Sequence, residues 1–159
     1  PSDMRPTYET SYDLDRERIV ASYLERAWNC NLRKLSKFGV LDFAFEKVNE
    51  EGILVVRGFV EVKRRNCAHD KYPTILVSSA KRQQALSLLD ATGCSSAFVI
   101  VYDDRVKYIS LIEPPCYTTV GGRFDRGDKS DEEVVLHYQI DRLSDLGQSP
   151  FQVDSINAA

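Results

Sequence analysis

Three charged residues have the types and the spacing of a metal-assisted hydrolytic site: Asp42, Glu61 and Lys63. Apolar and charged residues alternate around each of them, and this period of two predicts two β-strands joined as a hairpin. A two-residue turn at positions 51–52 would set Asp42 opposite Glu61, with their Cβ atoms about 4.5–5.5 Å apart. At that distance both carboxylates can bind a single cation.

The apolar side chains of the hairpin support this register. It stacks Leu41 on Val62 and Phe43 on Val60, whereas a shift by one residue would turn Glu61 to the other face of its strand. Residues 49–52 could also form a longer, bulged loop, so the type of turn is left open. The predicted register therefore depends on the apolar pattern rather than on the turn.

Two carboxylates and an ammonium group on a half-buried surface need compensation, because burying an unpaired charge is unfavourable by several kcal/mol. Oxygen atoms of Asp42 and Glu61, with the Val62 carbonyl as a further ligand, suit Mg²⁺, for which Mn²⁺ could substitute. Such an ion polarises a phosphoryl oxygen and lowers the pKa of a bound water. Lys63 could then position that water or offset charge on the phosphate. The alternative is an exposed hairpin face with weak salt bridges.

This part of the chain resembles the core of the PD-(D/E)XK nucleases: Asp42 is followed by a turn, a run of Val and Ile, and then Glu61-Val62-Lys63. This superfamily includes restriction enzymes, Holliday-junction resolvases and phage nucleases. Leu41 stands where the family has a Pro. The resemblance implies a restriction-endonuclease-like α/β fold over about residues 14–113, with an α-β-β-β-α-β core and a mixed sheet flanked by helices. It also implies Mg²⁺-dependent hydrolysis of DNA, in phage or bacterial repair, recombination or restriction.

The same resemblance implies further site residues. In several branches a glutamate of the first helix assists the metal, which makes Glu17 a candidate catalytic residue and Glu25 a second one. A Lys or Gln on the helix after the hairpin often lies close to the active site, and Lys81 and Gln84 match that position roughly. All four could instead be solvent-facing residues of ordinary helices.

Nucleic-acid contacts are expected from side chains around the motif and from a later glycine-containing loop: Arg64, Arg65, Lys81, Gln84, Arg123 and Arg126. Tyr72 or Tyr117 could stack on bases, although the sequence does not place them. Cys67 and His69 have no further ligands at usable spacing, so they are interpreted as loop residues. The net charge of −3 counts mildly against a DNA-binding protein, but basic residues cluster at 63–65 and 81–82.

Length and composition indicate one domain spanning 1–159, with 43% hydrophobic and 28% charged residues. No apolar stretch is long enough for a membrane span and no signal peptide is evident, so we expect a cytoplasmic protein of a bacterium or a phage-infected host. Four widely spaced cysteines without a CxxC pair favour free thiols over a zinc site.

The motif needs helices and strands to position it. Apolar residues at helical spacing predict a helix from a cap at Asp13 or Asp15 to Trp28, and another over 80–92 that ends at Gly93. We predict strands or extended segments at 30–36 (edge strand), 74–77 (extended piece), 96–102 (buried strand), 106–112 (its hairpin partner) and 133–140 (last edge strand). The other segments are a flexible arm at 1–12, a long loop at 116–132, a helical turn at 141–146 and a frayed tail at 147–159.

The preferred interpretation is a Mg²⁺-dependent nuclease that acts on DNA. One alternative is a nucleic-acid-binding or protein-binding module on the same fold that does not cleave. Another is an unrelated α/β protein whose hairpin charges are incidental. A homodimer is expected if two strands must be cut, whereas trimming of single strands needs none.

Overall fold

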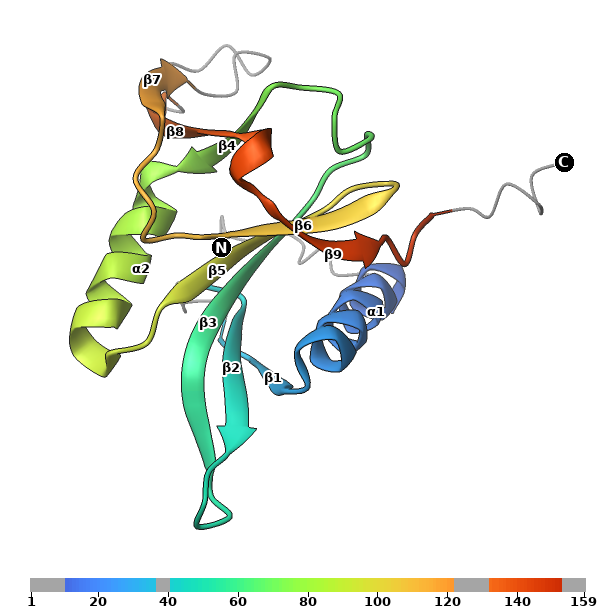
Figure 1. Ribbon diagram of the computed structural model, residues 1–159, viewed down its shortest axis with the longest axis vertical. Coiled ribbons are helices and arrows are strands. Elements are labelled where there is room, and N and C mark those ends of the chain that lie inside the picture. The colour runs from blue at the N-terminus through green and yellow to red at the C-terminus, as the bar shows by residue number, and fades with distance from the viewer. Residues whose placement is uncertain (1–10, 37–40, 122–131, 153–159) are drawn as a thin grey trace, which may run out of the picture.

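The structure is a computed structural model that describes residues 11–36, 41–121 and 132–152. Within these residues the chain forms two α-helices, a short 3₁₀ helix and nine strands: α1 (Ser11–Trp28), β1 (Asn31–Lys34), β2 (Phe43–Val48), β3 (Leu54–Arg64), β4 (Thr74–Ser78), α2 (Ser79–Thr92), β5 (Ser96–Val101), β6 (Arg105–Ser110), β7 (Tyr117–Gly121), β8 (Glu133–Gln139), η3 (Ile140–Arg142) and β9 (Ser144–Gln148). Six strands make a sheet in the order β1-β2-β3-β5-β6-β9, and three make a second sheet in the order β4-β8-β7 (Figure 1). β3 and β5 are parallel while the other neighbours are antiparallel, so the larger sheet is mixed, as expected.

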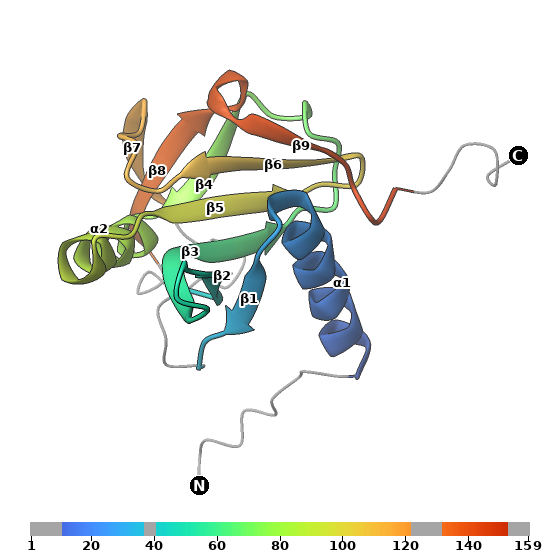
Figure 2. The same cartoon turned by 60° about the horizontal axis from the view of Figure 1, so that its bottom comes forward.

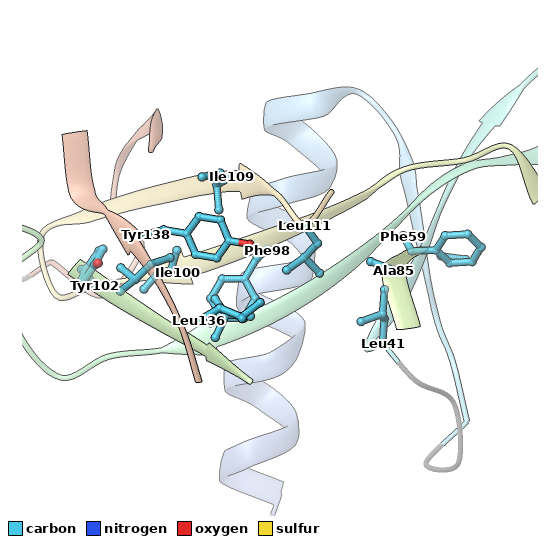
Figure 3. Close-up of a cluster of buried hydrophobic side chains, with 13 residues drawn as sticks. Leu41, Phe59, Ala85, Phe98, Ile100, Tyr102, Ile109, Leu111, Leu136 and Tyr138 are labelled. Carbon is cyan, nitrogen blue, oxygen red and sulfur yellow. The ribbon is translucent and has the colours of Figure 1, made fainter. Parts of the chain in front are cut away.

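Helix α1 covers one face of the larger sheet, and α2 with the smaller sheet covers the other (Figure 2). On the α1 side, Val20 and Leu24 pack against Val60 and Val99. On the opposite side, side chains of β5 and β6 pack against α2 and the smaller sheet: Phe98, Ile100, Ile109, Ala85, Val77, Leu136 and Tyr138 (Figure 3). The strands β3 and β5 are therefore covered on both faces, which agrees with the continuous apolar run of β5.

Both predicted helices are present. α1 begins at Ser11, so Asp13 and Asp15 lie inside it rather than capping it, and the last two residues of the predicted arm are helical. α2 begins after Ser78, whose hydroxyl accepts from the Ala80 N–H at 3.3 Å, and it ends at Gly93 with φ 75°. Among the described residues, neither helix combines the length and the apolar character needed to cross a membrane.

The hairpin has the predicted register at its charged end but a different turn. Asn49 closes the loop: its side-chain oxygen accepts from the backbone N–H groups of Glu51 and Ile53, and its own N–H donates to the Ile53 carbonyl at 2.8 Å. This longer loop shifts the pairing by one residue, and a β-bulge at Arg57 takes up the extra residue. Beyond the bulge Phe43 pairs with Val60, as predicted.

Leu41 does not stack on Val62, contrary to the prediction. It lies before β2 begins and packs in the cluster on the α2 side, whereas Phe43 and Val62 belong to the cluster on the α1 side. The reason is that the chain bends at Leu41 and Asp42, so the alternation of a regular strand does not apply there.

The last third of the chain contains more β-structure than predicted. Part of the expected loop 116–132 is strand β7, and the expected edge strand is the central strand β8 of the smaller sheet. The expected helical turn is present as η3 but is shorter than predicted, and in place of a frayed tail the chain continues into β9, which pairs with β6. Ser149 is buried and Phe151 packs against α1-side residues, so the tail is ordered at least to Gln152.

Candidate active site

The candidate active site lies where β2 and β3 separate. The antiparallel ladder ends with Phe43 opposite Val60, because the chain bends at Asp42. The Asp42 carboxylate then replaces a backbone partner: its Oδ2 accepts a hydrogen bond of 2.8 Å from the Val62 N–H. This bond fixes the carboxylate beside Glu61, the residue of β3 that precedes Val62. The predicted convergence of the two strands on Asp42 and Glu61 is therefore present in the geometry.

Glu61 is largely buried, with 13% of its side chain exposed, and it is contacted by the first turn of α2. Lys81 Nζ lies 3.0 Å from Glu61 Oε2. The other oxygen, Oε1, is buried and receives no hydrogen bond from the described residues. Burial, and after it the charge of Asp42, raises the pKa of Glu61, and Lys81 offsets this only in part. The charged form of Glu61 is therefore disfavoured where it stands.

This set of donors fits a divalent cation. Two neighbouring carboxylates and an orphaned, buried carboxylate oxygen are what a bound cation would satisfy. No group of three His, Cys, Asp or Glu side chains gathers in the part of the chain that the structure describes, and the four cysteines are free. Mg²⁺ suits such a site, because it binds through one or two protein carboxylates and keeps several waters.

Glu17 shares a hollow with Asp42, although Glu61 is not among the residues that line it. The hollow measures about 320 Å³, and Glu17 lines it together with Asp42, Phe43, Val62 and residues of other elements. Its carboxylate is 3.0 Å from Lys34 Nζ, so a basic residue of β1 holds it at the rim. The structure therefore brings Glu17 to the hollow that Asp42 borders, and its catalytic role stays a prediction.

Glu25 lies elsewhere. Its Oε2 accepts a hydrogen bond of 2.9 Å from the Leu32 N–H, which joins α1 to β1. Glu25 therefore stabilises the link between these elements and does not border the hollow beside Asp42.

The basic residues expected to bind DNA have different surroundings. Lys63 is exposed on β3, and Arg65, which directly follows this strand, is also exposed. Arg64 donates to the Val101 carbonyl at 3.0 Å and pairs with Asp103 at 2.5 Å, so its guanidinium is anchored to the end of β5. Arg123 and Arg126 lie outside the described residues. The DNA contacts proposed for these side chains stay predictions.

Gln84 is half-buried on α2, one turn after Lys81, and its Oε1 is also buried without a hydrogen bond from the described residues. Buried polar atoms in this state need a partner such as water or an ion. This places the expected pair Lys81 and Gln84 on the side of α2 that faces the sheet, rather than in solvent.

Two residues that line the hollow, Arg16 and Phe151, were not predicted from the sequence. Arg16 of α1 and Arg64 of β3 both place their guanidinium groups over the ring of Phe151, at 5.0 and 5.1 Å from its centroid. Phe151 lies in the segment that was expected to be a frayed tail, and Arg16 carries no motif. The only signal for Arg16 in the sequence is that it precedes Glu17. That signal is weak, because adjacent residues of a helix do not share a face.

A mixed sheet flanked by helices, with an Asp at the end of one hairpin strand and Glu-x-Lys on the next, defines the PD-(D/E)XK class. The family model described as "Phage putative PDDEXK endonuclease" matches residues 3–146, and the chain belongs to this family. The resemblance and the restriction-endonuclease-like fold expected from the sequence are thereby confirmed. Comparison with the curated proteins gives no match.

Replacing Glu61 by glutamine should remove a pH-dependent cost from the metal-free protein. The pKa of Glu61 is raised from its ordinary value of 4.5, so the folded chain binds this proton more tightly than the unfolded chain does. Its contribution to stability therefore falls as the pH rises from 4.5 through the raised pKa. In EDTA at neutral pH, Glu61→Gln should melt a few degrees above the wild type, since about 1 kcal/mol corresponds to about 2–4 °C at this size.

Thermal unfolding in EDTA and in Mg²⁺, at acidic and at neutral pH, measures this effect. With Mg²⁺ the wild type should gain stability that Glu61→Gln lacks. Glu50→Gln, at the exposed tip of the hairpin, is the matched control. Identical pH dependence of the wild type and Glu61→Gln in EDTA would contradict the assignment of the raised pKa.

Proposed function

We propose that the protein is a Mg²⁺-dependent deoxyribonuclease that hydrolyses phosphodiester bonds of DNA. The observation that supports this most strongly is the pairing of the Asp42 and Glu61 carboxylates where β2 leaves β3, with Glu61 Oε1 buried and unsatisfied. Family membership points to the same chemistry. The protein would act in the cytoplasm of a bacterium or a phage-infected host, where it would meet phage or bacterial DNA.

In this proposal Asp42 and Glu61 would hold the ion, and the Val62 carbonyl would be a third protein ligand. When bound, Mg²⁺ supplies polarisation of the phosphoryl oxygen and a lower pKa of its water. The Val62 N–H keeps Asp42 in place, and Lys81 orients Glu61 through the 3.0 Å ion pair.

Lys63 follows Glu61 by two residues on β3, so its ammonium group projects to the same side of the strand. There it would orient the attacking water or balance the charge that grows on the phosphate. Glu17, held by Lys34, would bind a further water at the rim of the hollow. Arg65 and Lys81 would contact the DNA backbone.

Incubation of the purified protein with supercoiled, linear, single-stranded and branched DNA tests this function. Each DNA is incubated with Mg²⁺, with Mn²⁺ and with EDTA. Cleavage in the presence of either metal and none in EDTA is the expected result. DNA binding without cleavage in any metal would favour a non-cleaving binding module on this fold, and neither activity would contradict both.

Lys81→Gln should lower the cleavage rate by about 10- to 100-fold, because residues that orient metal ligands contribute effects of this size. The substitution removes the charge 3.0 Å from Glu61 Oε2 but leaves the helix intact. Initial rates as a function of Mg²⁺ concentration measure it, and more Mg²⁺ should recover part of the loss. Lys47→Gln, exposed on β2, is the control. An unchanged rate would show that the ion pair does not support Glu61.

A further inference from the structure

A second hollow opens beyond the C-terminal end of β3. It encloses about 380 Å³, which lies within the range of about 300–1,000 Å³ for small-ligand pockets. Polar and aromatic side chains line it, together with residues 73–76: Arg65, Cys67, His69, Tyr72 and Tyr102. We call it the β3-end hollow.

The imidazole of His69 is fixed in orientation. Asp104 accepts from the His69 backbone N–H at 3.0 Å and contacts the ring Nδ1 at 2.6 Å. Nε2 is therefore directed away from Asp104. Burial alone would raise the pKa of Asp104, but the hydrogen bonds from His69 outweigh burial and lower this pKa. The Asp104 carboxylate is therefore charged and hydrogen-bonded at neutral pH. The neighbouring Asp103 is paired with Arg64.

Tyr72 supplies an aromatic surface at the rim of the hollow. It is 58% exposed, which is high for a large ring next to a pocket, and Lys71 Nζ lies 5.4 Å from its centroid. An exposed ring with a cation beside it is the arrangement with which proteins bind unpaired bases, through stacking and charge. Inside the hollow, the ring of Tyr102 packs edge-on against His69 at 6.5 Å.

The hollow adjoins the candidate active site through β3. Arg65 comes directly after the last residue of β3, and its backbone N–H still donates to the Val101 carbonyl at 3.0 Å, so it continues the pairing of this strand with the end of β5. In an extended chain it would lie about 6.6 Å beyond Lys63 on the same side. Glu61 lies one repeat before Lys63 on that side. A nucleic-acid strand whose phosphate reached Glu61 and Lys63 would therefore meet Arg65 next and His69 and Tyr72 after it.

These side chains suit a nucleotide better than a metal ion. Cys67 and His69 have no place in a three-ligand group among the described residues. A guanidinium suits a phosphate, an imidazole N–H suits a base edge, and an exposed ring suits a base face. A base inside a duplex cannot reach such a hollow without leaving its stack.

We propose that the β3-end hollow binds the nucleotide next to the scissile phosphodiester, in single-stranded or otherwise unpaired DNA. Arg65 binds its phosphate, His69 donates to or accepts from the edge of its base, and Tyr72 stacks on the base. The proposal rests on the proposed nuclease function and adds a preference for unpaired DNA at this position.

Binding of a fluorescein-labelled single-stranded oligonucleotide and of its duplex, followed by fluorescence anisotropy, tests the proposal. The full chain carries Asp42→Asn in all samples, so that the DNA is not cut. Adding Tyr72→Ala should weaken single-strand binding by about 5- to 150-fold, as expected for one base–aromatic stack. Tyr72→Phe should retain binding. Ile53→Ala, which removes an exposed apolar side chain from the loop of the hairpin, is the control and should leave binding unchanged.

Unchanged single-strand binding by Tyr72→Ala and Arg65→Ala, or equal losses for the single strand and the duplex, would overturn the nucleotide site while leaving the nuclease proposal intact. If the Asp42→Asn protein bound neither DNA, the nuclease proposal would fail first and this inference with it. In otherwise wild-type protein, Tyr72→Ala should raise KM for single-stranded DNA without a matching loss of kcat, which a general effect on folding would not produce.

Discussion

Asp42→Asn is expected to lower the rate of DNA cleavage by at least about 100-fold, because even residues one layer beyond a metal ligand contribute about 10- to 100-fold. The amide keeps the shape of the side chain, and its oxygen can still accept the 2.8 Å hydrogen bond from Val62. It lacks the charge that a divalent cation requires. The measurement is the initial rate on whichever DNA the wild type cuts best, at saturating Mg²⁺.

The control for this variant is Asp90→Asn, which makes the same chemical change on the exposed side of α2. It should cleave at the wild-type rate. Asp42→Asn should also melt at a higher temperature than the wild type in EDTA, since it removes the charge that, after burial, raises the pKa of Glu61. Full cleavage by Asp42→Asn would remove Asp42 from the metal site.

Lys63→Ala is expected to lower kcat by about 100- to 10,000-fold, the range for loss of a group that takes part in proton transfer or water positioning. Lys63 follows Glu61 by two residues, and alternation along β3 directs both side chains to one side. Single-turnover rates measure the chemical step, and anisotropy measures DNA binding separately. Lys63→Arg should recover only part of the rate, because a planar guanidinium is not equivalent to a compact ammonium.

Lys47→Ala, on the exposed part of the hairpin, controls for the loss of a positive charge near DNA. It should leave kcat unchanged. A Lys63→Ala protein that binds DNA weakly but cleaves bound DNA at the wild-type rate would show that Lys63 is a binding residue only.

The strand pairing at the site could be predicted from the sequence, although the turn could not. Apolar alternation placed Phe43 opposite Val60 correctly, because the two faces of the hairpin pack against different layers. The loop at Asn49 and the bulge at Arg57 shift the register twice in opposite directions, so the two errors cancel. Gly58 fits beside the bulge, since a Cβ there would lie 3.1 Å from the Ser95 carbonyl.

The surroundings of the carboxylates could be predicted only in part. Helix position pointed to Lys81, and the structure places it 3.0 Å from Glu61. Position could not reveal the contact of Glu17 with Lys34, nor the packing of Phe151 against Arg16 and Arg64, because these contacts join segments far apart in the chain. Short-range patterns carry no information about such pairs.

The C-terminal third was predicted least well. β9 is short and polar, and it contains Gly147, so neither alternation nor β-propensity marks it as a strand. It is stabilised by pairing with β6 and by ion pairs of Asp145 with Arg105 and Lys107. These tertiary contacts, rather than local preference, add the last strand to the larger sheet.

The proposed chemistry depends on a divalent cation shared by Asp42 and Glu61. Titration of Mn²⁺ into the protein, with free Mn²⁺ followed by electron paramagnetic resonance, measures that binding without any DNA. The wild type should bind Mn²⁺ and Mg²⁺ should compete for the same site, while Asp42→Asn and Glu61→Gln should each lose it. Equal Mn²⁺ affinity in the wild type and both variants would contradict the account.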